Sequence, residues 1–121
     1  MPRKFEKRKV EAVSLAKAKF ARVSARKVRF VADLIRGKRV GEAKLMLQFI
    51  HRPSAAPYVQ KVLESAVANV DHTEHPDPDE LKVGEIFVDV GPIMKRYQPR
   101  AMGRGCKIRK RSSHLTIRLT K

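Results

Sequence analysis

The segment from Gly91 to Arg111 carries eight basic side chains and no acidic one, and it limits the possible folds more than any other part of the chain. Its prolines and glycines are unfavourable inside a helix, because proline lacks a backbone donor and glycine loses more entropy on ordering. Alternating apolar residues precede it at 86–90 and follow it at 115–119, which is typical of strands. We therefore predict a long β-hairpin arm, at about residues 88–110, whose far end leaves the domain. Its basic residues are Lys95, Arg96, Arg100, Arg104, Lys107, Arg109, Lys110 and Arg111.

The predicted arm has no apolar core of its own, since its few apolar side chains are scattered. From Asp89 to a tip near Arg100 is eleven residues. At about 3.3 Å per residue the arm could reach roughly 35 Å. A cationic arm of this kind needs a partner that orders it, and a polyanion is the natural candidate.

Charge divides the chain into two basic ends and an acidic middle. Residues 1–40 hold 14 basic and 3 acidic side chains, residues 41–90 hold 4 and 9, and residues 91–121 hold 10 and none. The formal net charge of the whole chain is +16. A compact domain with this charge repels itself, which favours a neutralising partner such as a nucleic acid. We expect both basic ends to face that partner.

The length of 121 residues indicates one domain, and the order of apolar patterns predicts an α+β fold. We predict three helices packed on a small three-stranded antiparallel sheet, with a long protruding β-hairpin. Residues 1–13 form a basic N-terminal tail that we expect to be disordered without an anion, and residues 14–121 form the globular domain. The expected strands are 15–23, 81–90 and 107–120, the expected helices are 24–37, 40–50 and 54–70, and 71–80 is an acidic surface turn.

The helices are predicted from apolar residues at helical spacing. Ser24 and Ser54 are the expected N-caps, and Gly37 is the expected C′ residue of the first helix. Pro57 is tolerable in the first turn of the third helix. The expected buried stripes are Val28, Val31, Leu34 and Ile35, then Ala43, Met46, Leu47 and Ile50, and finally Val59, Val62, Leu63, Ala66, Val67 and Val70.

Basic residues outside the arm gather on the first strand and beside the buried stripe of the first helix. Such residues are most often a solvated surface, but here they adjoin the basic tail, so we assign them to RNA contact. A thin hairpin suits the gaps between packed RNA helices. A domain that binds DNA with a flat face would need no such protrusion. These predicted RNA-binding residues are Lys17, Lys19, Arg22, Ser24, Arg26, Lys27, Arg29, Arg36 and Lys38.

The residues that could carry other chemistry lack the partners that this chemistry needs. His72 and His75 have no third fixed ligand, so we predict no metal site. Cys106 is the single cysteine, which excludes an internal disulfide, and His114 is too far along the strand to act as its base. No run of about 18 apolar residues offers a membrane span, and no secretory signal is apparent. We therefore predict a non-enzyme without catalytic residues, cofactor or small-molecule substrate, located in the cytoplasm or inside an organelle.

Three blocks of the sequence resemble the bacterial-type L22 family of large-subunit ribosomal proteins. They are VSARKVRFVADLIRGK (23–38), VLESAVANV (62–70) and IFVDVGPIMKRYQPRAMGRGCKIRKRSSHLTI (86–117). The resemblance implies a structural constituent of the large ribosomal subunit that binds large-subunit ribosomal RNA, aids assembly and lines the nascent-peptide exit tunnel with its arm. The implied partners are this RNA, neighbouring ribosomal proteins and the nascent polypeptide.

The resemblance also implies roles for particular positions of the arm. It places a tunnel-lining tip at Met94, Lys95, Arg96, Pro99, Arg100, Ala101, Met102, Gly103 and Arg104. It places further RNA contacts on the returning strand at Lys107, Arg109, Lys110, Arg111, Ser112 and His114.

Two other functions stay open at this point. A general architectural nucleic-acid binder would embrace DNA with the arm and would bind random duplex DNA and structured ribosomal RNA about equally well. A small RNA-modifying enzyme would show turnover that depends on Cys106 or His114.

Overall fold

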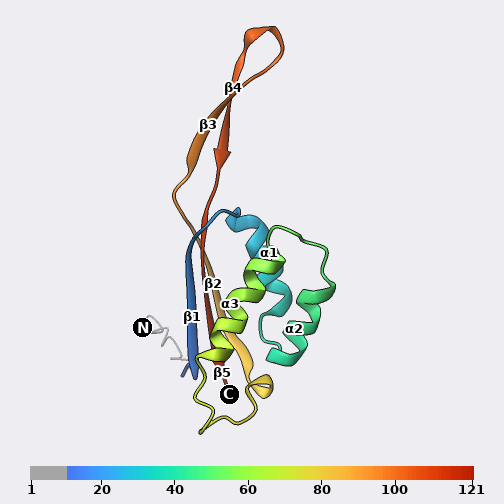
Figure 1. The fold of residues 1–121 in the computed structure, drawn as a ribbon, viewed down its shortest axis with the longest axis vertical. Helices are drawn as coiled ribbons and strands as arrows, with labels where there is room; N and C mark the ends of the chain where they lie inside the picture. Colours follow the sequence, from blue (N-terminus) through green and yellow to red (C-terminus); the bar gives the residue numbers. More distant parts are fainter. Residues whose placement is uncertain (1–10) are drawn as a thin grey trace, which may run out of the picture.

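The computed structural model describes residues 11–121, which form three α-helices and five strands and confirm the predicted α+β class. Three strands form an antiparallel sheet in the order β1-β5-β2, and the helices cover one face of it (Figure 1). The other two strands pair with each other and project from the domain as the arm. The elements are β1 (Ser14–Ala21), α1 (Ala25–Ile35), α2 (Val40–Phe49), α3 (Ala56–Ala68), η1 (Pro78–Glu80), β2 (Lys82–Val90), β3 (Met94–Pro99), η2 (Ala101–Gly103), β4 (Gly105–Lys110) and β5 (Ser113–Thr120).

β5 is the central strand of the three-stranded sheet, and its side chains alternate between the helices and solvent. Every second residue from Ser113 to Leu119 is buried, and the residues between them are partly exposed. Ile117 pairs with Ala16 of β1 on one side and with Ile86 of β2 on the other. The apolar alternation that predicted this strand therefore marks its helix-facing side.

The predicted single strand at 107–120 is wrong in one respect, because it is broken into β4 and β5. The pairing of β2 with β5 ends at Val90 and Ser113, and the pairing of β3 with β4 begins at Met94 and Lys110. Pro92 lies in the gap and has no N–H to donate, so the ladder cannot run on through this point.

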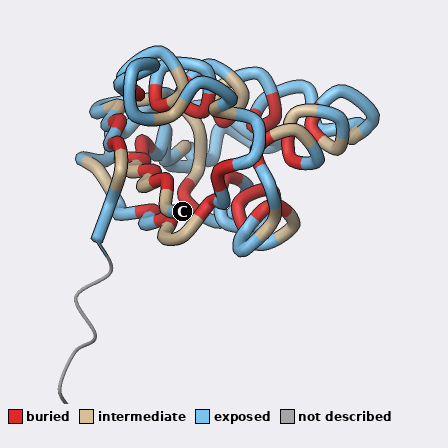
Figure 2. Tube along the Cα trace, turned by 90° about the horizontal axis from the view of Figure 1, so that it is seen from below, coloured by how far each residue is buried: buried red, intermediate tan, exposed pale blue. Residues whose placement is uncertain are grey.

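The helices bury the faces that their apolar spacing predicted. Val28, Val31 and Ile35 of α1 are fully buried, as are Val59 and Leu63 of α3. Figure 2 shows the buried residues gathered in the interior of the domain, with exposed residues around them. Four predicted positions are only partly buried because they lie at the margins of their stripes, namely Leu34, Met46, Ile50 and Val67.

The predicted ends of α1 are at the right residues, although one predicted bond is absent. Ser24 occupies the N-cap position, but its hydroxyl makes no capping hydrogen bond, and the residue lines a surface cleft. Gly37 takes a φ of +77° just after the helix, as expected of a C′ glycine. Its N–H donates to Val83 O at 2.9 Å, and Val83 N–H donates to Lys38 O at 2.9 Å. The chain after α1 thus pairs with the start of the β2 edge.

The predicted N-cap of α3 at Ser54 is wrong, because the helix begins two residues later. Ala55 holds the N-cap position without a side-chain bond, and Ala56 N–H donates to Arg52 O at 2.9 Å. This backbone bond satisfies the first N–H of the helix, so no side-chain cap is needed. Pro57 lies in the first turn as predicted.

β1 ends in a bulge. Its register with β5 shifts between Ala18 and Ala21, and Phe20 takes a φ of +59°, which is uncommon for a bulky side chain. Phe20 N–H donates to His114 Nδ1 at 3.0 Å, and the Tyr58 hydroxyl donates to Ala18 O at 3.1 Å. Burial raises the pKa of Tyr58 above its ordinary value of 10.0.

The acidic segment 71–80 is a surface turn, as predicted. Asp71 Oδ1 accepts hydrogen bonds from the hydroxyl and the N–H of Thr73, at 2.7 and 2.9 Å, and these bonds lower the pKa of Asp71. Asp79 pairs with Lys44 of α2 at 2.6 Å, which ties the end of the turn to the helical layer.

The predicted N-terminal tail falls largely on residues 1–10, which lie outside the described part of the chain. Val13, the last residue of that predicted tail, donates its N–H to Leu119 O at 2.8 Å. Pairing with the sheet therefore begins one residue before β1. None of the helices within 11–121 has the length and apolar character needed to cross a membrane.

Removing the arm should leave the domain folded, because the described core has no member between Val88 and Leu115. Val90 and Ser113 are already paired, so replacing residues 91–112 by Asn-Gly would join them through a two-residue hairpin turn. We expect this excised protein to unfold in one cooperative thermal transition followed by circular dichroism. A broad, non-cooperative melt would instead show that the arm contributes to the stability of the domain.

Candidate nucleic-acid interface

The arm consists of two exposed strands with no core between them. β3 pairs with β4 from Met94 and Lys110 at one end to Pro99 and Gly105 at the other. Every residue of the two strands is exposed except Ile108, which is half-buried. The basic side chains that were predicted to bind RNA are therefore accessible along the arm, namely Lys95, Arg96, Lys107, Arg109 and Lys110, with Arg100, Arg104 and Arg111 exposed just beyond its strands.

The tip of the arm forms near Arg100, as predicted. Arg100 N–H donates to Arg104 O at 2.6 Å, which closes the turn. Met102 and Gly103 both take left-handed conformations, with φ of 61° and 69°. The Met102 side chain is 95% exposed, so it extends from the end of the arm without any contact to the domain.

Three residues that we expected at the tip lie instead near the other end of the arm. β3 starts at Met94, and Met94 pairs with Lys110 in the first pair of the arm. The resemblance placed Met94, Lys95 and Arg96 at the tip, and this position was wrong, because the two-stranded section of the arm begins at Met94. The residues that form the tip are Pro99, Arg100, Ala101, Met102, Gly103 and Arg104.

The root of the arm is the short section where the two sheets meet. Gly91 N–H donates to Ser112 O at 2.9 Å, and the Ser112 hydroxyl donates to Pro92 O at 2.6 Å. A Cβ added at Gly91 would lie 2.5 Å from Ser112 Oγ and 3.2 Å from Ser112 C, so a larger residue there would displace the Ser112 side chain. The hydroxyl of Ser112, which was predicted to contact RNA, thus donates to a carbonyl of the protein itself.

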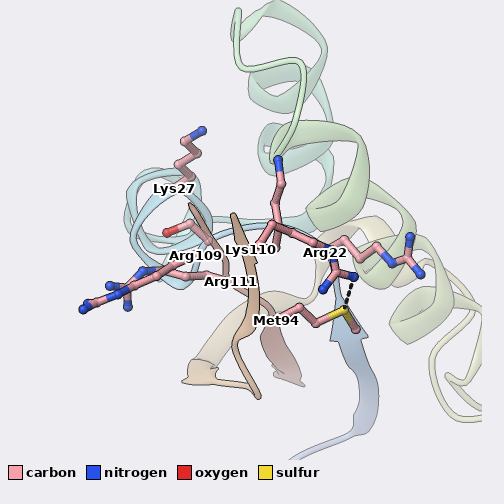
Figure 3. Close-up of a pocket in the computed structure, with 8 residues that line it drawn as sticks. Arg22, Lys27, Met94, Arg109, Lys110 and Arg111 are labelled. Atoms are coloured by element: carbon pink, nitrogen blue, oxygen red, sulfur yellow. Dashed lines mark hydrogen bonds between the residues drawn. The ribbon is translucent and has the colours of Figure 1, made fainter. Parts of the chain in front are cut away.

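A cleft of about 450 Å³ opens at the root of the arm (Figure 3). Figure 3 shows its basic side chains fanned around the two arm strands and the start of α1. The fold brings together residues that the sequence separates widely, since Arg22, Ser24 and Lys27 come from the domain and the others from the arm and its root. The lining residues are Arg22, Ser24, Lys27, Met94, Arg96, Arg109, Lys110 and Arg111, and none of them is acidic.

Two of the predicted RNA-binding arginines are engaged by the free edge of β2. Arg29 donates to Val88 O from Nη2 at 2.9 Å and from Nε at 3.3 Å. Arg36 donates to Ile86 O at 3.2 Å and pairs with Asp33 at 2.8 Å. These side chains satisfy carbonyls that the edge strand would otherwise leave open. Their guanidinium groups therefore have a structural role besides the one that we predicted.

The face of the sheet that the helices leave uncovered holds another group of predicted residues. Lys17 and Lys19 of β1 line a hollow of about 260 Å³ together with Phe20, Asp89 and His114. The Phe20 and His114 rings meet edge to face with centroids 4.9 Å apart, and His114 Nδ1 accepts the Phe20 N–H. Among the remaining predicted residues, Arg26 is exposed on α1 and Lys38 is half-buried.

Sequence reasoning missed a stacked pair beside the root cleft. The Arg52 guanidinium lies 4.4 Å from the centre of the Phe30 ring. Both residues line a hollow of about 190 Å³ with His51 and with Lys27, which also lines the root cleft. A guanidinium group stacked on an aromatic ring presents its outer planar face, on which a nucleic-acid base can stack. The available signal was Phe30, a large apolar residue outside the buried stripe of α1.

Within residues 11–121, no three His, Cys, Asp or Glu side chains are placed to hold a metal ion. Cys106 is exposed on β4, whereas His114 lies on β5 of the other sheet against Phe20. The pair that an RNA-modifying enzyme would need is therefore divided between the arm and the domain.

Comparison with known protein families gives a match to the family described as "Ribosomal protein L22p/L17e", over residues 16–120. The matched range contains the three helices, the whole arm, β2 and β5, and all of β1 except its first two residues. It includes every residue of the root cleft and of the tip.

The role of Arg29 at the β2 edge can be separated from its charge by exchange for lysine. Arg29→Lys keeps the positive charge but loses the two-pronged bond to Val88 O. We expect a loss of about 1 kcal/mol in the free energy of unfolding measured with urea. Arg26→Lys on the same helix is the matched control, since Arg26 is exposed, and it should leave stability unchanged. Equal stability of the two variants would contradict the structural role of Arg29.

Proposed function

The chain belongs to the ribosomal protein L22p/L17e family, and from that premise we propose that it binds large-subunit ribosomal RNA with its arm and arm root and lines the nascent-peptide exit tunnel with its tip. Membership of this family makes the chain a structural, non-enzymatic constituent of the large ribosomal subunit. The proposal concerns which surfaces of the molecule carry that role.

The observation that carries the proposal is an exposed, strongly basic arm without a core. Its eight basic residues face no acidic residue on either strand. Lysines and arginines that neutralise phosphates release condensed counterions, which yields strong and salt-dependent binding. Duplex RNA presents its backbone and shape rather than its base edges, and a narrow two-stranded arm fits between packed RNA helices.

The tip supports the tunnel part of the proposal. The turn at residues 99–104 ends the arm with Met102 fully outside the domain, flanked by Arg100 and Arg104. Arginines there would hold RNA on the tunnel wall, and the exposed Met102 side chain would face the passing nascent polypeptide. The domain would remain with neighbouring ribosomal proteins at the surface of the subunit. We place this role at ribosomes of the cytoplasm or of an organelle with a bacterial-type ribosome.

Binding by both ends of the chain would also aid assembly. Arg22 and Lys27 in the domain and Arg100 and Arg104 at the tip lie at opposite ends of the arm. A protein that binds phosphates at both places would link RNA segments that are far apart, and its high charge would speed the encounter.

Salt resistance of the bound protein tests whether the arm is enclosed by RNA. We expect the tagged chain to sediment with the large subunit at about 0.1 M salt and still at about 1 M, although simple phosphate contacts weaken steeply over that range. The variant with residues 91–112 replaced by Asn-Gly should be released at the higher salt. The double variant Arg100→Gln/Arg104→Gln retains the arm but loses two of its eight basic side chains, and it should stay bound if enclosure by RNA holds the arm.

Release of the intact chain at high salt, or its migration with DNA, would contradict enclosure by ribosomal RNA. That outcome would favour the architectural nucleic-acid binder.

The tunnel contact itself can be tested by crosslinking. In a Cys106→Ser background, Met102→Cys places one thiol at the tip, and Glu64→Cys places one on the exposed surface of α3. Ribosomes stalled with a cysteine-containing nascent chain should give a bismaleimide crosslink to the first variant and none to the second. Absence of the tip crosslink at every position of the nascent cysteine would contradict the tunnel-lining role.

A further inference from the structure

The cleft at the root of the arm spans the point where the sheet of the domain ends and the two-stranded arm begins. On one side of that point the last pair of the domain sheet is Val90 with Ser113, and on the other the first pair of the arm is Met94 with Lys110. Among the described residues, the hydrogen bonds found between those pairs are Gly91 N–H to Ser112 O and Ser112 hydroxyl to Pro92 O. The arm is thus joined to the domain by a short section with few bonds.

The charges of the cleft lie on both sides of this joint. Arg22 and Lys27 belong to the domain, whereas Arg96 and Arg109 belong to the arm. Lys110 ends the arm strand and Arg111 lies in the joint itself. Because the lining contains no acidic residue, the domain side and the arm side of the cleft repel each other in the isolated protein.

An anion in the cleft would reverse this repulsion. Arginine guanidinium groups bind phosphate oxygens in two-pronged fashion, and lysine ammonium groups bind them as point charges. The Ser24 hydroxyl also lines the cleft and makes no capping bond to α1, so it can donate to a phosphate oxygen. A group that binds both sides at once would hold the arm at one angle.

We infer that a phosphodiester segment of RNA occupies this cleft and bridges the domain to the arm, so that RNA binding fixes the direction of the arm. The inference rests on the proposed RNA binding and adds a mechanical consequence to it. The arm of the free protein samples a range of angles about the joint, and the bound arm has a single direction. The arm would then take up the direction that places its tip in folded RNA only where RNA phosphates already lie at its root.

The single native cysteine provides the probe for a test. Cys106 is exposed on β4, and Phe49→Cys adds a second exposed thiol on α2, so spin labels at both report the distance from arm to domain. Pulsed electron resonance would compare the full chain alone, with a short RNA duplex, and with sodium sulfate at matched ionic strength. We expect the RNA duplex to narrow the distance distribution to one sharp peak, and sulfate to leave it broad.

Two double variants separate the cleft from the rest of the protein surface. Arg22→Gln/Lys27→Gln removes the domain side of the cleft, and the narrowing by RNA should be lost. Lys61→Gln/Lys82→Gln removes the same charge from the exposed surface of the domain, outside the cleft, and should narrow as the parent does. Fluorescence anisotropy with the same duplex measures RNA binding by each protein separately.

The outcomes distinguish the inference from the function on which it rests. RNA binding without narrowing, or equal narrowing in sulfate or in the cleft variant, would overturn the bridge and leave the proposed function intact. Failure of the parent to bind the duplex at all would count against the proposed function itself.

Discussion

The pairing of β2 with β5 supports everything else in this molecule, because the same two strands form the sheet and lead into the arm. Ile117 of β5 is fully buried and pairs with Ile86, which anchors the ladder in the core. Eight residues after Ile86, at Met94, the chain has left the domain, and every residue of the two arm strands except Ile108 is exposed. The core must therefore be complete without the arm, and it is, since the apolar cluster stops at Val88 and resumes at Leu115.

Basic residues serve two purposes in this fold, and their contacts show which. Arg29 and Arg36 close the free edge of β2 by donating to Val88 O and Ile86 O. Arg118 pairs with Glu85 at 2.9 Å and lies 5.4 Å from the Phe87 ring, so it also acts within the sheet. The cations of the arm have no such partners on the neighbouring strand, which is why they are the ones available to a polyanion. A net charge of +16 alone would not have separated these groups.

Sequence patterns predicted the elements well because those patterns follow from burial. The stripe Val28, Val31 and Ile35 and the alternation of β5 each reflect one face turned to the core. The root cleft could not be predicted in this way, because it depends on β1 lying beside β5, which brings Arg22 near Arg111. The bulge at Phe20 and the break at Pro92 were missed for a related reason. Each interrupts a strand locally, while the apolar residues on either side still alternate as they would in an unbroken strand.

The tip shows the same limit of sequence reasoning. Its place near Arg100 was predictable from the length of the two basic half-strands, whereas Met94 and Arg96 proved to lie at the root. The family resemblance had placed both of them, together with Lys95, at the tip. Only the register of β3 against β4 fixes how far along the arm each side chain stands.

An arm of two strands has two free edges, and such edges invite pairing with other chains. Natural proteins protect edges with charge, and here lysines and arginines occur at seven positions from Lys95 to Lys110. The side chains proposed to bind RNA would therefore also keep free copies of the protein from pairing edge to edge before assembly. Neutralisation by RNA would remove that protection at the moment when the surrounding RNA takes over the same surface. The same basic residues would thus prevent edge-to-edge pairing in the free protein and bind RNA in the assembled subunit.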